Sequence, residues 1–346
     1  MEKIEVAIGL MVIIVGIFLY YISIEIENKI QVEEEIIPSF EKSSIVFYNI
    51  TYIIEAKYLV VNTYKIVIKD YAYVTLPRNT TYQKAYLISM NPKPIRIERD
   101  EDGNSFAVVF VKAEPGEKIW INATYLVKVS GYKIFFNVNE SIWPNYSMVA
   151  RYTVKTRLWN TEREDIVDLA YKLRKGSTPL EIATNVAKWV QNHISYTILT
   201  ARVGSDGALV KTPLGYIVRG DCTEVADVYV TLMRILGIPA RTVFGMLLSE
   251  PKSKMWINMT TAWIEGERLL KHWGGHMWSQ VYLPPWGWVD VELLEEPRVK
   301  LGDYSNLHVI FGIEETKYYG TTLGNLCAPG YLTLEYIEME FKPTGG

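Results

Sequence analysis

A cysteine at the predicted start of a helix is the residue of this sequence best placed to do chemistry. Residues 220–245 read GDCTEVADVYVTLMRILGIPARTVFG, in which apolar residues recur at helical spacing after Cys222 until a Gly-Ile-Pro stop. Asp221 and Thr223 are common capping residue types, so we expect Cys222 in the first turn. Backbone N–H groups and the helix dipole there favour a thiolate, which attacks carbonyl carbons. The alternative is a small buried apolar residue, as many free cysteines are.

A base for this thiol is available in a second segment. His276 opens the alternating run HMWSQVYLPPWGWVDVE, which predicts two strands joined by a Pro-Pro-Trp-Gly turn. Such a hairpin brings its ends together, and Asp290 and Glu292 share a face by strand parity. Either carboxylate could therefore orient the imidazole of His276. The candidate catalytic residues are Cys222, His276 and either Glu292 or Asp290.

These segments resemble the transglutaminase-like superfamily of papain-like enzymes over about residues 161–295. The resemblance implies helices packed on an antiparallel sheet, with Cys222 as nucleophile and His276 as base. The family's closing Gly-Trp-Val-x-x-Asp pattern, counted from Trp288, implies that Glu292 is the orienting acid, with Asp290 as the fallback. The residues that match are Gly220, Cys222, Ala226, Arg234, Gly237, Ile238, Pro239, Ala240, Arg241, Val243, Gly245, His276, Trp278, Val281, Tyr282, Gly287 and Trp288.

Composition limits the other function classes. The 346 residues suffice for two domains, and a net charge of -3 without basic runs gives no support for nucleic-acid binding. The four histidines and two cysteines show no metal-ligand spacing, so we expect neither a metal nor a cofactor. Cys222 and Cys327 could instead form a disulfide if the protein lies outside the cytoplasm.

The N-terminus predicts a membrane anchor. Residues 6–24 carry no charge and are long enough to cross a bilayer as one helix, so we predict an anchor at 1–24 and an acidic linker at 25–43. Glycosylation motifs occur only beyond this segment, which predicts a single-pass glycoprotein with its body outside the cytoplasm. Their asparagines are Asn49, Asn79, Asn122, Asn139, Asn145 and Asn258.

Two folded parts follow the linker. Residues 44–150 consist of short β-branched and aromatic runs separated by turn residues, which predicts an all-β sandwich. Residues 151–346 form the predicted catalytic domain, with helices at 162–175 and 179–193 opened by capping-box patterns, then C-terminal strands. The predicted fold class is therefore α+β.

The resulting hypothesis is a surface enzyme that hydrolyses or transfers acyl groups at peptide or glutamine amide bonds of protein or peptide substrates. Hydrolysis is favoured over cross-linking because water at about 55 M competes with amines unless a cleft excludes it. The alternative is a catalytically inactive binding or scaffold protein that uses the same fold.

Overall fold

The computed structural model describes residues 42–344, except 146, 148, 200, 262–270, 296–298 and 315–325. The predicted anchor at 1–24 and the linker up to residue 41 lie outside the described residues. Over the part that is described, no helix is long and apolar enough to cross a membrane.

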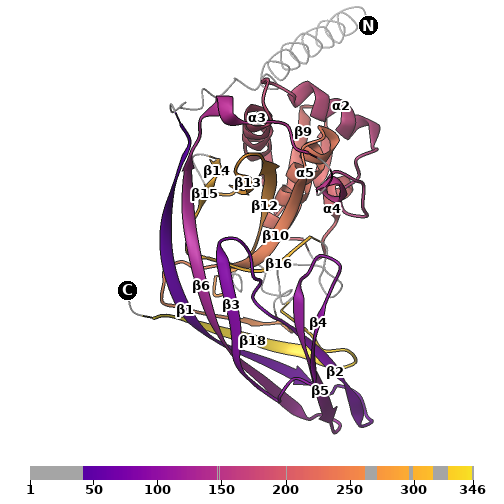
Figure 1. Cartoon of the computed structure of the whole chain (residues 1–346). Helices are drawn as coiled ribbons and strands as arrows, with labels where there is room; N and C mark the ends of the chain where they lie inside the picture. The colour runs from indigo at the N-terminus through magenta and orange to yellow at the C-terminus, as the bar shows by residue number, and fades with distance from the viewer. Residues whose placement is uncertain are drawn as a thin grey trace, which may run out of the picture.

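Long antiparallel strands form the lower part of the molecule (Figure 1). Strand β1 lies between β6 and β18, and its side chains alternate so that Tyr52, Ile54, Ala56 and Tyr58 are fully buried. This six-stranded sheet contains β1 (Ser44–Val61), β3 (Gln83–Asn91), β6 (Lys118–Phe135), β11 (Ser253–Asn258), β15 (Asp303–Tyr304) and β18 (Thr333–Pro343).

A second sheet shares the buried core of the first. It has four strands in the order β17-β2-β5-β4, and residues such as Val74 and Val109 are fully buried in it. Its members are β2 (Ile68–Thr75), β4 (Arg96–Arg99), β5 (Ser105–Ala113) and β17 (Cys327–Ala328). Between residues 44 and 135 the described elements are all strands, as the alternating pattern predicts.

The strand pairing crosses the predicted domain boundary at residue 150. C-terminal β18 pairs with β1 over ten residue pairs, from Tyr52↔Pro343 to Val61↔Thr333, and β17 pairs with β2. Two short 3-10 helices, η1 (Val138–Glu140) and η3 (Ala150–Tyr152), lead from β6 toward the helical part. The C-terminal strands therefore complete the N-terminal sheets, while the domain limits stay a prediction.

Helices and a five-stranded sheet form the upper part of the molecule (Figure 1). Both expected helices are present, as α2 (Glu164–Leu173) and α3 (Pro179–Asn192), and α5 (Cys222–Ile235) packs on β12. The capping box forms at α3, between Thr178 and Glu181, but the one predicted at the start of α2 is wrong, because Arg163 precedes that helix without a side-chain capping bond. The sheet contains β10 (Ala240–Leu247), β12 (Gly275–Leu283), β13 (Gly287–Glu292), β14 (Lys300–Leu301) and β16 (His308–Ile313). Of the described residues, 47% are in strands and 18% in helices, so helix contributes less than the α+β prediction implies.

A smaller three-stranded sheet precedes α5. Its middle strand, β9 (Gly215–Gly220), ends directly before the helix and so fixes where the helix begins. The other elements are β7 (Ile194–Tyr196), α4 (Gly204–Ala208) and β8 (Leu209–Thr212).

The asparagines of most glycosylation motifs lie at the surface. Those at 49, 79, 122, 139 and 145 are exposed, and the one at 258 is half-buried. Their side chains are accessible to modification, while the location outside the cytoplasm and the glycosylation stay predictions.

Candidate active site

Cys222 is the first residue of α5, and local contacts fix that helix start. Asp221 caps the helix by accepting from the Thr223 N–H at 2.9 Å, and the Glu224 carboxylate accepts from the Asp221 N–H at 3.2 Å. Gly220 has φ +150, and a Cβ there would lie 2.3 Å from the Glu224 Cβ. The glycine therefore leaves room for the capping box, and the predicted position of Cys222 is confirmed.

His276 and Glu292 meet across the predicted hairpin. The His276 Nε2 atom lies 2.6 Å from Glu292 Oε2. Glu292 Oε1 accepts from the backbone N–H groups of Leu293 and Leu294, both at 2.9 Å. The carboxylate is therefore fixed at one oxygen by the backbone and presents the other to the imidazole.

Asp290 lies elsewhere on the same sheet face. In the antiparallel register it is directly opposite Gln280, four residues from His276, whereas Glu292 lies two residues closer to the histidine. Asp290 accepts from Tyr132 Oη at 2.6 Å, Trp278 Nε1 at 2.7 Å and Gln280 Nε2 at 2.9 Å. The structure thus brings Glu292 to the imidazole and commits Asp290 to a separate buried network.

The imidazole joins the carboxylate to the thiol. Burial by itself would lower the pKa of His276, but the Glu292 charge and hydrogen bonds to Cys222 and Glu292 outweigh it and hold this pKa well above its ordinary value. Burial would raise the pKa of Glu292, yet His276 holds it far below its usual range. A carboxylate paired with an imidazolium is therefore the favoured state of this pair.

Glu224 also affects the charge at this helix start. Burial, followed by the nearby charges of Asp221 and Asp227, raises the pKa of Glu224 to about 7. Near neutral pH this carboxyl is partly protonated, which reduces the negative charge that would oppose a thiolate at Cys222.

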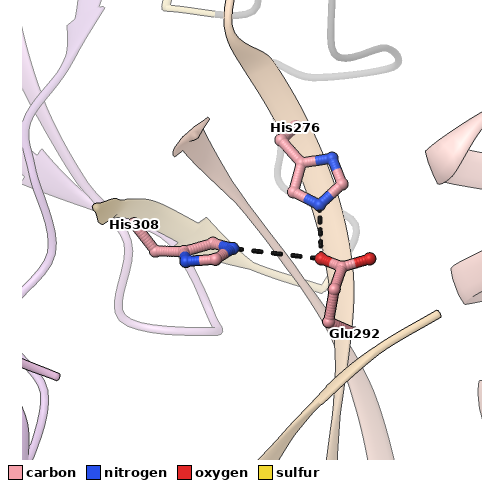
Figure 2. Close-up of side chains that lie close together, drawn as sticks. All are labelled: His276, Glu292 and His308. Atoms are coloured by element: carbon pink, nitrogen blue, oxygen red, sulfur yellow. Dashed lines mark hydrogen bonds and ion pairs between the residues drawn. The ribbon is translucent and has the colours of Figure 1, made fainter. Parts of the chain in front are cut away.

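His308 is the site residue that the sequence analysis missed. Its Nε2 atom lies 3.9 Å from Glu292 Oε2, so two imidazoles approach the same carboxylate oxygen (Figure 2). The ring is buried, and it packs edge-on against Trp278 at 5.0 Å between centroids. His308 sits in an apolar strand, and its sequence position gives no hint that β16 runs beside β10 and reaches the hairpin.

The same three side chains include potential metal ligands. Among the described residues, ligand atoms of His276, Glu292 and His308 all lie within 4.8 Å of one another. A metal ion held there would bind the carboxylate that orients His276, and it would compete with the hydrogen bond between them. These three side chains can therefore either assist the thiol or bind a metal ion, but they cannot do both at the same time.

Cys327 is separate from this site. Both cysteines are free, so the disulfide considered for Cys222 is not formed. Cys327 is 4% exposed in β17, and burial raises its pKa to about 12, which keeps it a thiol at neutral pH. Of the two, only Cys222 has an imidazole partner among its described contacts.

Buried ion pairs join α5 to neighbouring segments of the chain. Asp227 is fully buried and accepts from Arg202 Nη2 at 2.5 Å, Arg202 Nε at 2.9 Å and Trp159 Nε1 at 2.8 Å. Near the helix end, Arg234 donates to both carboxylate oxygens of Glu314 at 2.9 Å. These contacts fix the helix against neighbouring segments and so fix the position of Cys222.

Helix α5 begins with a cysteine and packs on an antiparallel sheet that carries a histidine–carboxylate pair. This fold therefore places a thiol beside a base. Residues 167–293 match the family model described as the transglutaminase-like superfamily, so this segment is similar to a transglutaminase-like core. The matched residues include all four candidates from the sequence, Cys222, His276, Asp290 and Glu292.

Individual relatives are distant. An uncharacterized protein of Haemophilus influenzae is 26% identical over 133 residues, so the match spans 38% of this chain and about a third (36%) of that protein. A candidate cysteine protease from Cytophaga hutchinsonii has a similar structure, with a TM-score of 0.55 at 14% identity, covering 86% of this chain and 92% of that one. The periplasmic domain of TgpA from Pseudomonas aeruginosa gives a TM-score of 0.35 at 16% identity, covering 69% of each chain. The Cytophaga structure supports the fold over most of the chain.

Proposed function

We propose that this protein is a cysteine-dependent enzyme that transfers acyl groups from peptide or glutamine amide bonds to water. The single observation that carries the proposal is the continuous contact from Cys222 through His276 to Glu292 at a helix N-terminus. A nucleophile in contact with a base, which is itself oriented by a third group, is the arrangement that covalent acyl transfer requires.

The proposed reaction has two steps. The Cys222 sulfur attacks the amide carbon, and backbone N–H groups at the start of α5 stabilise the oxyanion. The imidazolium of His276 then donates its proton to the leaving amine as the C–N bond breaks, which leaves a thioester. In the second step His276 takes a proton from water, the hydroxide oxygen bonds to the carbon, and the thiolate leaves with the acid as product.

Glu292 acts through His276 in this scheme. Its Oε2 accepts from His276 Nε2 and so leaves Nδ1 as the ring nitrogen that serves the thiol. In Figure 2, that second ring nitrogen points away from the carboxylate. The carboxylate also stabilises the imidazolium, which supports the proton transfers in both steps.

Whether water or an amine accepts the acyl group can be tested with one protein substrate and one amine. We expect purified protein incubated with casein and a fluorescent primary amine to release new peptide or ammonia faster than it incorporates the amine. Separation of the products by mass and measurement of protein-bound fluorescence give both rates, and Cys222→Ala is the matched control for background.

Two results would change the proposal. Incorporation that depends on Cys222 and outpaces hydrolysis would contradict water as the main acceptor and indicate a transglutaminase. Neither reaction, over several protein substrates, would contradict the enzyme and favour the binding or scaffold alternative.

A further inference from the structure

A second pocket lies on the sheet away from the thiol. It has a volume of about 340 Å³ and lies between the segment 78–82, which connects β2 to β3, and residues of β10, β12 and β13. The connecting segment is fixed to β16, because the Arg78 N–H donates to the Ile310 carbonyl at 2.9 Å and Gln83 bonds both the N–H and the C=O of Ile310. Both walls of the pocket are therefore held by the fold.

Two arginines line this pocket without an anionic partner. The Arg241 guanidinium lies 3.9 Å from the centroid of Trp288 and donates from Nε and Nη2 to Gln280 Oε1 at 2.9 and 2.7 Å. Arg78 donates to the Asn104 side-chain oxygen and to the Asp102 carbonyl, both at 2.8 Å. Within the described ranges, neither guanidinium forms an ion pair with a carboxylate.

The electrostatics of the pocket favour an anion. Burial lowers the pKa of Arg241, and the nearby charge of Arg78 acts in the same direction, while Tyr152 and Glu314 partly offset both effects. The carboxyl group in the lining, Asp290, is already committed to Tyr132, Trp278 and Gln280. Two like charges that are partly removed from water are costly, and an incoming anion would relieve that cost.

We propose that this pocket binds an organic carboxylate that carries a flat apolar body. The planar guanidinium fork of arginine matches a carboxylate, and the partly exposed rings of Trp286, Trp288 and Tyr282 offer apolar surface for the rest of the ligand. The carboxylate could belong to a free aromatic acid or to the C-terminus of a peptide, since both present the same group.

The site is distinct from the proposed active site. Gln280 lies four residues beyond His276 along β12, which corresponds to about 13 Å at the rise of a strand. Ligand binding here therefore does not depend on the thiol chemistry and can be measured in a Cys222→Ala background.

Calorimetry with N-acetyl-tryptophan and its neutral amide tests the assignment. We expect the acid to bind at least about tenfold more tightly than the amide, because only the acid gains charge-assisted hydrogen bonds. Arg241→Met should remove this difference, whereas Arg219→Met, at an exposed arginine outside the pocket, should preserve it. A short peptide with a C-terminal tryptophan distinguishes the two sources of the carboxylate. If this peptide binds more tightly than N-acetyl-tryptophan, the ligand is the C-terminus of a peptide.

A second pair of variants covers the case in which Arg241→Met does not fold. Thr81 is exposed at the pocket rim, so Thr81→Glu should weaken the acid but not the amide, while Thr81→Gln should leave both unchanged. Equal affinity for acid and amide would overturn the proposal. An affinity for the acid that Thr81→Glu leaves unchanged would also overturn it. A third contrary result would be that inorganic phosphate displaces N-acetyl-tryptophan from the pocket at the same concentration as acetate does.

Discussion

Replacing Glu292 by glutamine should lower kcat by about 10²–10⁴-fold, while Asp290→Asn should change it by less than about tenfold. The glutamine side chain has nearly the same size, but a neutral amide does not stabilise the imidazolium of His276. Asp290 instead accepts hydrogen bonds from Tyr132, Trp278 and Gln280, away from that ring. Steady-state kinetics of both variants, with circular dichroism as a check on folding, measure the ratio.

The pH profile separates this effect from a general loss of structure. Activity of the unmodified protein should fall as pH rises through the raised pKa of His276, because the imidazolium that protonates the leaving amine is lost. Glu292→Gln removes the charge that supports this pKa, so the alkaline limb should move to lower pH. An unchanged limb in Glu292→Gln, or a larger loss in Asp290→Asn, would contradict the assignment of Glu292.

Replacing Asp227 by alanine should destabilise the fold by about 3–5 kcal/mol, because it removes the buried carboxylate that balances the charge of Arg202. Both side chains are nearly inaccessible, and Trp159 Nε1 loses its acceptor as well. Urea unfolding followed by tryptophan fluorescence reports the change as a lower midpoint. Asp227→Asn preserves the volume and so separates loss of charge from loss of packing.

A surface pair gives the matched control. Asp165 accepts from Arg163 at 2.6 Å, but both side chains are about a third exposed, so Asp165→Ala should cost at most about 1 kcal/mol. Equal destabilisation by Asp227→Ala and Asp165→Ala would show that the buried pair does not stabilise α5 as argued.

The local signals around the thiol predict most of the site. Helical spacing, the Asp221 cap and the Gly-Ile-Pro stop place Cys222 in the first turn, where the structure has it. Strand parity puts Asp290 and Glu292 on one face, but parity repeats every two residues and cannot choose between them. The choice depends on the register, which sets Gln280 opposite Asp290.

Contacts between distant segments are what the sequence does not reveal. His308 approaches Glu292 only because β16 pairs with β10, and β18 joins β1 although about 270 residues separate them. An alternating pattern shows that a residue run is a strand, but it does not name the partner strand. The pocket at Arg241 depends on the segment 78–82 for the same reason.

The most direct test of the central claim is to find the acyl group on the enzyme. Acid quench during turnover of an activated ester or peptide substrate, followed by peptide mass mapping, should locate the acyl group on the Cys222 sulfur and on no other residue. Hydroxylamine should release it, as expected for a thioester, and Cys222→Ala should show neither adduct nor turnover. Turnover that persists in Cys222→Ala, or an acyl group carried by Cys327 instead, would contradict the account.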